Sequence, residues 1–290
     1  RSLAISESKI PDYIKNNKEE VESWDHDNAN IVFSTISMRF GRKLRNQVFK
    51  TILMDEAAQC QEAWMWGLLR PEVKYIHMAG DPNQLPALVS DEGVELNHGR
   101  SLMERLIKLG YKVELLDTQR RMHPKIVDFP NINFYDGKLK SDYKDPKLNI
   151  EPFLIYDVKG QEKIEGTSYM NKKEVEKVVE IYNELKNIVN EIIVIAPYQA
   201  QCNLLKKMNK NIKIHTVDSF QGNEADAVIM TTVRSGNNIG FWSDYRRLNV
   251  GMTRSKHILR IVGNVNSWEK SDNPLKKLAI YGRKKNIIQN

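Results

Sequence analysis

The stretch T-V-D-S-F-Q-G-N-E-A-D-A-V-I-M-T-T-V-R-S runs from Thr216 to Ser235, and R-R-L-N-V-G-M-T-R follows from Arg246 to Arg254. Its apolar run, Ala227–Val233, predicts a buried strand. A polar turn with a glycine precedes this strand, and an arginine-bearing segment follows it. Glycine lets backbone approach a ligand closely, and arginine pairs with phosphate, so this order is typical of a nucleotide site.

Short apolar runs of the same kind recur along the chain. Between them, the segment Lys172–Val189 carries apolar residues at three- and four-residue spacing, which predicts an amphipathic helix covering a sheet. Short apolar strands alternating with such helices indicate parallel α/β layers. The other predicted strands are Ile31–Ser34, Thr51–Met54, Tyr75–Ala79, Val113–Leu116, Phe153–Tyr156, Ile192–Ala196 and Ile258–Val262.

The strands divide into two sheets, which predicts two domains, 1–111 and 112–290. The segment Tyr135–Lys147 is predicted to be an exposed loop and Lys284–Asn290 a polar tail, because both are rich in polar or turn-forming residues. Two tryptophans at Trp64 and Trp66, and two at Trp242 and Trp268, are expected in the core or at a domain interface.

Composition sets wide bounds on function. The 290 residues are 41% hydrophobic and carry a net charge of +7, which permits a polyanionic partner without requiring one. Only Cys60 and Cys202 are present and neither has a C-x-x-C partner, so a disulfide scaffold and a structural zinc site are not expected. The sequence shows no run of the ~20 apolar residues that a membrane span needs, so we expect no membrane partner and a cytoplasmic or nuclear location.

The acid pair Asp55 and Glu56 directly follows the predicted strand Thr51–Met54. The carboxyl end of a parallel strand is where α/β proteins bind ligands. In phosphoryl-transfer sites one acid holds Mg²⁺ and a second polarises the attacking water, so we assign Asp55 to magnesium and Glu56 to the general base. The plain alternative is a helix start, since acids favour a first helical turn.

Two further polar segments follow predicted strands. G-D-P-N-Q-L-P, Gly80–Pro86, has the residues of a turn that projects polar side chains from a strand end, although an ordinary turn has the same composition. Q-R-R-M-H-P, Gln119–Pro124, holds two adjacent arginines. Two neighbouring guanidinium groups are not easily buried together without anions, so at least one is expected to face solvent or a ligand.

These motifs together resemble the second half of a superfamily 1 helicase, in the group that contains the nonsense-mediated-decay RNA helicase and senataxin. The resemblance rests on M-D-E-A-A-Q at Met54–Gln59 and on the segments quoted above, and it covers roughly Ile31 to Asn266. It implies tandem RecA-like P-loop NTPase domains with parallel sheets, and the cofactors ATP and Mg²⁺ bound between the domains.

The resemblance also implies roles for single residues. Gln84 senses the γ-phosphate with Asp81 in support, Arg121 contacts the γ-phosphate, and Arg254 is the arginine finger. Glu224 contacts the ribose, and Gln221 and Gly222 complete that nucleotide-binding turn. Arg120 departs from the motif, where the family has a tyrosine that stacks on adenine, and a guanidinium plane could take over the stacking.

Single-stranded RNA or DNA is the expected partner. Six residues at strand ends and in the opening stretch match family positions that contact the strand, and they could offer hydroxyls and backbone amides to phosphates. Each of them could equally be a capping or turn residue. They are Ser34, Thr35, Pro197, Tyr198, Thr216 and Val217.

One expected motif is absent from the sequence. No G-x-x-x-x-G-K-[ST] occurs, so the phosphate-binding loop with its lysine is missing. In the family this loop lies upstream of the acid pair. We therefore expect the chain to begin partway through the first domain, either as a fragment or with the missing half on another polypeptide.

The sequence thus predicts the core of an ATP-dependent helicase that moves 5′-to-3′ on a single strand, with its first domain truncated at the N-terminus. The alternative is a non-catalytic nucleic-acid-binding subunit of a larger assembly. A nuclease or polymerase is disfavoured because no second carboxylate cluster accompanies the acid pair.

Overall fold

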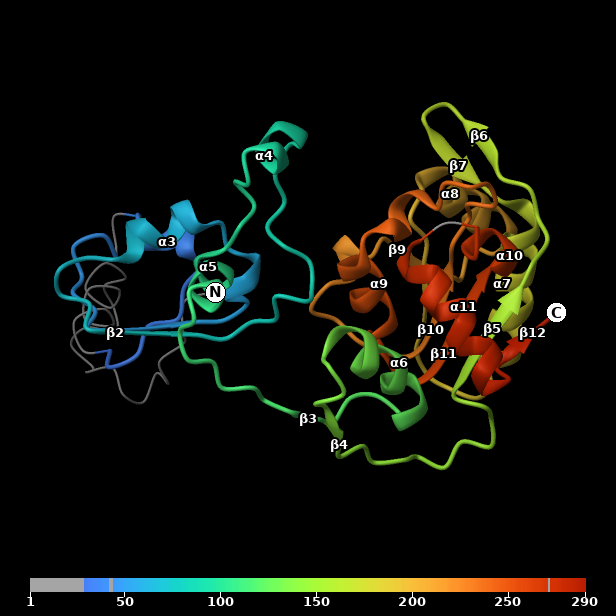
Figure 1. Ribbon diagram of the computed structural model, residues 1–290, viewed down its shortest axis with the longest axis horizontal. Helices are drawn as coiled ribbons and strands as arrows, with labels where there is room; N and C mark the ends of the chain where they lie inside the picture. The colour runs from blue at the N-terminus through green and yellow to red at the C-terminus, as the bar shows by residue number, and fades with distance from the viewer. Residues whose placement is uncertain (1–28, 42–43, 271) are drawn as a thin grey trace, which may run out of the picture. The chain divides into compact units, whose positions relative to one another are not determined.

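The computed structural model describes residues 29–41, 44–270 and 272–290 (Figure 1). The chain divides into two compact units. Unit 1 contains the residues up to Asp81 together with Pro86–Tyr111, and unit 2 contains Pro82–Leu85 and Lys112–Asn290. The short segment Pro82–Leu85 therefore belongs to unit 2 although unit 1 flanks it on both sides. Among the described residues, none of the helices has the length and apolar character to cross a membrane.

Unit 1 is built on two parallel strands, β1 (Thr51–Met54) and β2 (Tyr75–Met78), paired in register from Thr51↔Tyr75 to Met54↔Met78. Its apolar cluster includes Met54, Met65 and Leu102. On the other face of the sheet, Leu53 and Tyr75 are exposed. The helical segments are α2 (Ile36–Arg39), η2 (Ala57–Gln59), α3 (Glu62–Leu68), α4 (Asp91–Glu95) and α5 (Leu102–Lys108).

Unit 2 contains a six-stranded, fully parallel sheet with strand order β12-β5-β11-β10-β8-β9. The central strands are buried on both faces, which explains their continuous runs of branched apolar residues. The strands are β5 (Phe153–Asp157), β8 (Ile192–Ile195), β9 (Lys213–His215), β10 (Ala225–Thr231), β11 (Ser255–Gly263) and β12 (Ile288–Gln289).

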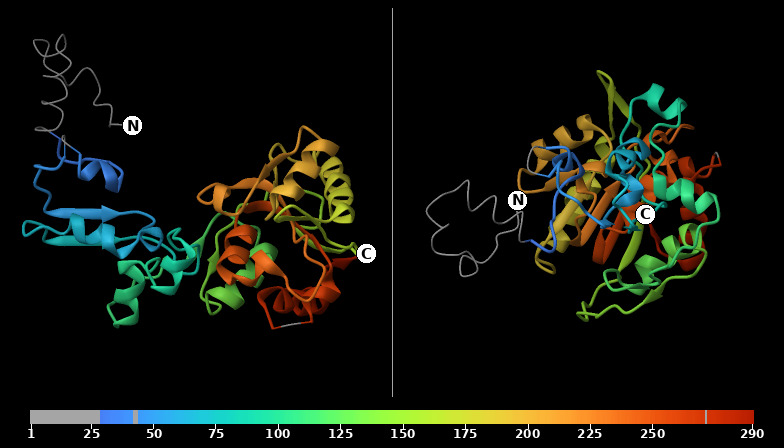
Figure 2. Two further views of the ribbon diagram at one scale, coloured as in Figure 1. Left: turned by 90° about the horizontal axis from the view of Figure 1, so that it is seen from above. Right: turned by 90° about the vertical axis from the view of Figure 1, so that its left-hand side faces the viewer.

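Helices cover both faces of this sheet, and alternate residues of β10 point to opposite layers. Val228 and Met230 pack in the layer of α6 (Pro124–Phe134), α9 (Tyr245–Met252) and α11 (Pro274–Lys285). Ala227 and Ile229 pack in the layer of α7 (Lys172–Leu185) and α8 (Gln199–Met208). Figure 2 shows α7 and α8 in yellow and gold and α9 and α11 in orange and red.

Smaller elements surround the sheet. The two-residue strands β3 (Thr118–Gln119) and β4 (Lys140–Ser141) pair in parallel, and β6 (Lys163–Glu165) and β7 (Ser168–Met170) form a hairpin. Figure 1 shows this hairpin projecting from the rest of unit 2. The remaining short helices are η3 (Asp218–Phe220), η4 (Gly240–Ser243) and α10 (Val265–Trp268).

A buried polar network lies under the end of β10. Glu174 is fully buried, and its carboxylate accepts hydrogen bonds from the Thr231 hydroxyl at 2.5 Å and the Val233 amide at 2.8 Å. Asn171 donates to the Val233 carbonyl at 3.2 Å, and Gln201 donates to the Thr231 hydroxyl at 3.0 Å. Val233 has φ +67°, a left-handed conformation that is strained for a β-branched residue, so this network fixes an unfavourable turn.

The predicted α/β class with a parallel sheet is confirmed, and so are six of the predicted strands, within two residues at each end except for the first residues of β11. The helix predicted over Lys172–Val189 is also confirmed, although it ends at Leu185. Ile31–Ser34 and Val113–Leu116 were wrong as strands, because these segments have no strand neighbour and Ile31 and Leu116 are largely exposed.

A further correction concerns the polar tail, and burial distinguishes the four tryptophans. The tail Lys284–Asn290 is not free: α11 runs to Lys285, Asn286 reverses the chain at φ +54°, and β12 pairs with β5. Trp242 and Trp268 are core residues, as predicted. Trp64 and Trp66 lie outside the core of unit 1, with 46% and 54% of their surfaces exposed, and a place at a domain interface stays a prediction for both.

Candidate functional site

The acid pair lies in a tight turn at the carboxyl end of β1. Glu56 adopts φ +51°, and its amide donates to the Asp55 Oδ1 atom at 3.0 Å. The Gln59 side-chain amide donates to Glu56 Oε2 at 2.7 Å. Both acids are exposed. The turn therefore presents two carboxylates to solvent, each held by one local hydrogen bond.

Gly80 packs directly behind this turn. A Cβ atom at position 80 would lie 2.8 Å from the Ala58 nitrogen and 3.0 Å from the Ala57 nitrogen, so a side chain there would displace the acid-pair turn. The Ala57 amide also donates to the Ala79 carbonyl at 2.8 Å. Asp81, predicted to support the nucleotide site, follows as the last residue of this part of unit 1.

Gln84 lies in unit 2, on the segment Pro82–Leu85. Leu85 is buried in the larger core cluster of that unit, and the Asn83 side chain donates to the Phe134 carbonyl at 2.7 Å. Asn249 of α9 donates to the Asn83 carbonyl at 2.9 Å. These contacts fix the segment, and Gln84 Oε1 accepts a bond from Arg254 Nη2 at 3.4 Å.

Arg254 is only 2% exposed and lies two residues after the end of α9. Its Nε donates to the Val250 carbonyl at 3.0 Å, and its Nη2 lies 3.2 Å from the Thr253 hydroxyl. Arg121 reaches the same residue, since its Nη1 donates to the Thr253 carbonyl at 3.1 Å. Two guanidinium groups are thus anchored on one residue.

Glu224 completes this arrangement from the turn before β10. Arg121 Nε donates to Glu224 Oε2 at 2.6 Å, and Lys256 Nζ lies 3.7 Å from Glu224 Oε1. Partial burial raises the pKa of Glu224, but the hydrogen bond and charge of Arg121 and the charge of Lys256 outweigh it and hold this pKa below its usual value. We call Gln84, Arg121, Glu224 and Arg254 the arginine cluster.

The two other predicted residues of the turn flank the arginine cluster. Gly222 has φ +79°, and no atom lies within 4 Å of the place where its Cβ would stand, so glycine is needed for the backbone conformation. The Gln221 Nε2 atom is buried and donates no hydrogen bond to any described residue. Because a buried amide without an acceptor is costly, Gln221 suits a ligand oxygen at this place.

Arg120 has a different partner from its neighbour Arg121. Its Nε donates to Asp142 Oδ2 at 2.9 Å, and the two side chains are 72% and 62% exposed. This pair extends the β3–β4 ladder, in which Gln119 lies opposite Ser141. The predicted base-stacking role of Arg120 is not tested by these contacts.

The predicted strand-contacting residues belong to both units. Ser34 and Thr35 are exposed in unit 1, where Thr35 precedes α2. In unit 2 the Tyr198 hydroxyl, next to Pro197, accepts from the Phe241 amide at 3.2 Å. Thr216 and Ser219 exchange capping bonds of 3.0 and 3.2 Å. Val217 is fully buried in the core, so only its backbone is available for a strand.

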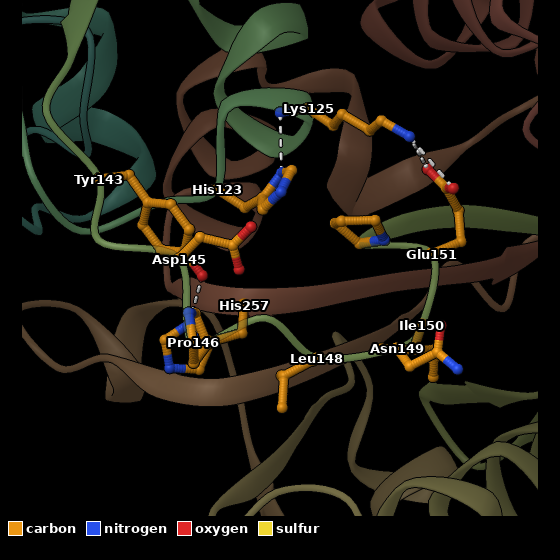
Figure 3. A pocket seen from close by; sticks show the side chains of 11 residues that line it. His123, Lys125, Tyr143, Asp145, Pro146, Leu148, Asn149, Ile150, Glu151 and His257 are labelled. Carbon is orange, nitrogen blue, oxygen red and sulfur yellow. Dashed lines mark hydrogen bonds and ion pairs between the residues drawn. The ribbon is translucent and has the colours of Figure 1, made fainter.

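Sequence reasoning did not find a pocket of about 430 Å³ in unit 2 (Figure 3). We call it the His–Tyr pocket. It is lined by the start of α6, the loop before β5 and the start of β11, and the Tyr143 hydroxyl lies 2.7 Å from His257 Nδ1. The His123 Nδ1 atom accepts a hydrogen bond from the Lys125 amide at 3.1 Å. Tyr143 and His257 gave no sequence signal, because only the fold brings them together.

Comparison with known protein families decides the affiliation of the chain. Two family profiles, both described as an AAA domain, match residues 98–266 and 2–92. The chain belongs to this AAA-domain family. Its relatives include a probable helicase, MAGATAMA 3, of Arabidopsis thaliana, which is 35% identical over 90% of this chain and 36% of its own length.

Two further relatives of the chain carry names of helicases or of nonsense-transcript regulators. An uncharacterized ATP-dependent helicase of Methanocaldococcus jannaschii is 37% identical over 82% of this chain, and a regulator of nonsense transcripts 1 homolog of Arabidopsis thaliana is 34% identical over 86%. The chain covers 39% and 22% of their own lengths. The predicted membership of the superfamily 1 group of the nonsense-mediated-decay helicase and senataxin is thereby confirmed. A solved arterivirus helicase in complex with DNA aligns with a TM-score of 0.41 at 15% identity over 73% of this chain and 39% of its own, too weak a likeness to carry an argument.

Proposed function

We propose that this chain carries the acid pair and the arginine cluster of an ATP-dependent helicase, in which ATP hydrolysis drives 5′-to-3′ movement along single-stranded RNA or DNA. The observation that carries the proposal is the convergence of Gln84, Arg121, Glu224 and Arg254 in unit 2 from four separate segments of the chain. Relatives named as helicases over most of this chain support it.

The residues present fit ATP and Mg²⁺. Two guanidinium groups anchored on Thr253 form a positive site suited to phosphate oxygens, and the unpaired Gln221 amide beside Glu224 offers a further donor. The described residues contain no group of three or more metal-ligating side chains. Magnesium in phosphoryl-transfer sites usually takes one or two carboxylates plus substrate phosphates and waters, so Asp55 alone is an adequate protein ligand.

The proposed roles follow from charge and position. Bound ATP with Mg²⁺ supplies the phosphoryl group that is transferred to water. Arg254 and Arg121 neutralise the charge that develops on that group, and Gln84, bonded to Arg254, links the phosphate contacts to the segment Pro82–Leu85. Glu56, oriented by the Gln59 amide, accepts the proton of the attacking water.

The sequence holds no phosphate-binding lysine loop, so we propose that hydrolysis also requires such a loop from outside these residues. The isolated 290-residue chain should then bind a single strand in a salt-sensitive way but hydrolyse no ATP. Robust hydrolysis by the purified chain, dependent on Glu56, would contradict this requirement.

The test of the function is a pair of arginine substitutions in the natural full-length protein. Arg254→Lys should lower kcat for ATP hydrolysis by on the order of 10³-fold while strand binding stays measurable. Arg260→Lys is the matched control, because Arg260 is equally buried but donates to the backbone carbonyls of Glu151 and Pro152. It should cost stability and spare hydrolysis.

Steady-state ATPase, unwinding and thermal melting of both variants decide between the alternatives. Equal losses of hydrolysis in the two variants, in proportion to their melting temperatures, would show that Arg254 is only structural. Tight single-strand binding by an unsubstituted full-length protein that hydrolyses no ATP would instead establish a non-catalytic binding subunit.

A further inference from the structure

Two of the residues predicted to contact nucleic acid lie at the carboxyl edge of the unit 2 sheet. The parallel strands β8 and β9 end beside each other, at the register pair Ile195↔His215. Tyr198 and Thr216 follow these two ends within three residues. Ligands of parallel α/β sheets bind at the carboxyl ends of the strands, so this edge of unit 2 is the expected place for a bound nucleic acid.

The start of η4, after β10, packs against Tyr198. The Phe241 amide donates a hydrogen bond to the Tyr198 hydroxyl oxygen at 3.2 Å. Gly240 has φ +57°, and a Cβ atom at this position would collide with the same oxygen. Only glycine therefore lets the backbone approach the tyrosine so closely. These two contacts fix Phe241 as a neighbour of Tyr198 although 43 positions separate them in the sequence.

Two arginines of this region each lie over an aromatic ring. The guanidinium carbon of Arg234 is 4.0 Å from the centroid of the Tyr169 ring, which in turn lies 5.3 Å from the centroid of the Tyr198 ring. The guanidinium carbon of Arg247 is 4.2 Å from the centroid of the Phe241 ring. A guanidinium group that is held over a ring keeps its in-plane N–H groups for another acceptor.

The two arginines differ in their charge partners. Arg234 Nε donates to both carboxylate oxygens of Glu162 at 3.1 Å, so its charge is neutralised within unit 2. Arg247 is partly buried, yet no described residue forms an ion pair or a hydrogen bond with its side chain. A partly buried charge without a partner is costly. Arg247 therefore suits an anion that a ligand supplies, whereas Arg234 does not.

A phosphate group of a nucleic-acid backbone fits this place. The Nε atom of Arg247 is fully buried, which leaves the two Nη atoms as the accessible donors. Guanidinium N–H groups match the geometry of phosphate oxygens, and the Phe241 ring beneath them fixes their plane. A protein carboxylate would also neutralise the charge, but Tyr198 and Thr216 at the same edge match positions that contact nucleic acid. The position of Arg247 therefore favours a nucleic-acid phosphate.

We propose that Arg247, stacked on Phe241, binds a backbone phosphate of the single-stranded RNA or DNA that contacts Tyr198. This inference rests on the proposed function. It adds one residue of α9 and one of η4 to the nucleic-acid surface of unit 2. It also gives the two ends of the segment Arg246–Arg254 different ligands, because Arg247 holds the nucleic acid and Arg254 the phosphates of ATP. The helix α9 then connects the two binding sites within unit 2.

The experiment measures how the natural full-length protein binds oligouridylate or oligothymidylate, whichever it binds more tightly, by fluorescence anisotropy at several salt concentrations. Arg247→Ala should weaken binding by on the order of 10-fold. It should also reduce the slope of log affinity against log salt concentration by about 0.7, the contribution of one phosphate contact on a single strand. Arg247→Gln, which keeps part of the contact with Phe241, should lose the same slope, and Arg247→Lys should keep it. Binding of a non-hydrolysable ATP analogue should be unchanged in all three variants.

Arg283→Ala is the matched control, because it also removes one positive charge from unit 2, at an exposed arginine of α11 that is paired with Glu269. Its salt slope should equal that of the unsubstituted protein. An unchanged slope in Arg247→Ala and Arg247→Gln, or an equal loss in Arg283→Ala, would overturn the inference. Loss of both the oligonucleotide and the ATP analogue, with a lower melting temperature, would assign Arg247 to the packing of α9 instead. Failure of the unsubstituted protein to bind either oligonucleotide would overturn the proposed function together with the inference.

Discussion

The acid pair of unit 1 and the arginine cluster of unit 2 are held in opposite ways. Asp55 and Glu56 are exposed, and each has one hydrogen bond to a residue within three positions. The arginine cluster joins residues up to 170 positions apart, and Arg254 is almost fully buried. Substitutions in the acid pair should therefore change chemistry alone, whereas those in unit 2 should change chemistry and stability together.

The largest effect is expected from Glu56→Gln. The variant keeps the shape of the side chain but loses the charge that accepts a proton, so hydrolysis should fall on the order of 10²–10⁴-fold while ATP binding persists. Because the side chain is exposed, the free energy of unfolding should change by at most about 0.5 kcal/mol. Glu95→Gln, an exposed acid of α4, is the control for steady-state ATPase and melting. Normal ATP hydrolysis by Glu56→Gln would show that Glu56 is not the general base.

Arg121→Ala should follow, with a loss in hydrolysis of roughly 10²–10³-fold, the usual effect of removing one donor to a developing negative charge. Its ion pair with Glu224 is partly exposed, so the stability cost should stay at about 1 kcal/mol. Kinetics and chemical denaturation of the same samples test both parts. A large stability loss with unchanged kinetics would mean that Arg121 serves only to hold Glu224.

The buried carboxyl group of Glu174 in unit 2 should make the stability of the protein depend on pH. Burial raises its pKa to about 7, so the folded protein binds a proton between pH 4.5 and 7 that the unfolded chain has released. Stability should therefore fall as pH rises through this window, by about 3 kcal/mol, and this contribution should be constant above it. Glu174→Gln should remove that slope in denaturation at several pH values. Glu176→Gln, a partly exposed acid on the same helix, should retain it, and an unchanged slope in Glu174→Gln would contradict the assignment.

The smallest effect is expected from Arg120→Ala. Its ion pair with Asp142 is exposed on both sides, so stability should fall by at most about 1 kcal/mol. Hydrolysis should be nearly normal, in contrast to Arg121→Ala at the adjacent position. Equal losses of hydrolysis in Arg120→Ala and Arg121→Ala would contradict the different roles expected for these two arginines.

The sequence predicted the elements whose apolar runs are buried on both sides. β8 and the apolar middle of β10 pack in two layers, so their pattern could be read without knowing their neighbours. Val113–Leu116 is also mostly apolar but has no adjacent strand, and composition cannot report a missing partner. β12 was missed for the converse reason, because two residues gain strand structure only by pairing with β5.

The residues of the candidate site also divide into those that local sequence predicts and those that only the fold brings together. The local acid-pair turn follows from a strand and its next two residues. The roles of Gln84 and Arg254 were inferred from the resemblance alone, and their hydrogen bond was not predicted, since nothing in either segment indicates the other. Tyr143 and His257 were missed because they are 114 positions apart and belong to no motif that was recognised.

The burial of Leu85 in the core of unit 2 bears on how the protein can be dissected. A fragment cut at the boundary between Tyr111 and Lys112 would lack this leucine, and with it the side chain of Gln84 that accepts from Arg254. Such a fragment would have a cavity in place of the Leu85 side chain. Its free energy of unfolding should be lower, since deleting a buried leucine side chain typically costs about 2–5 kcal/mol. Residues 112–290 are therefore an incomplete folding module, and a peptide spanning Pro82–Leu85 should complement them in trans.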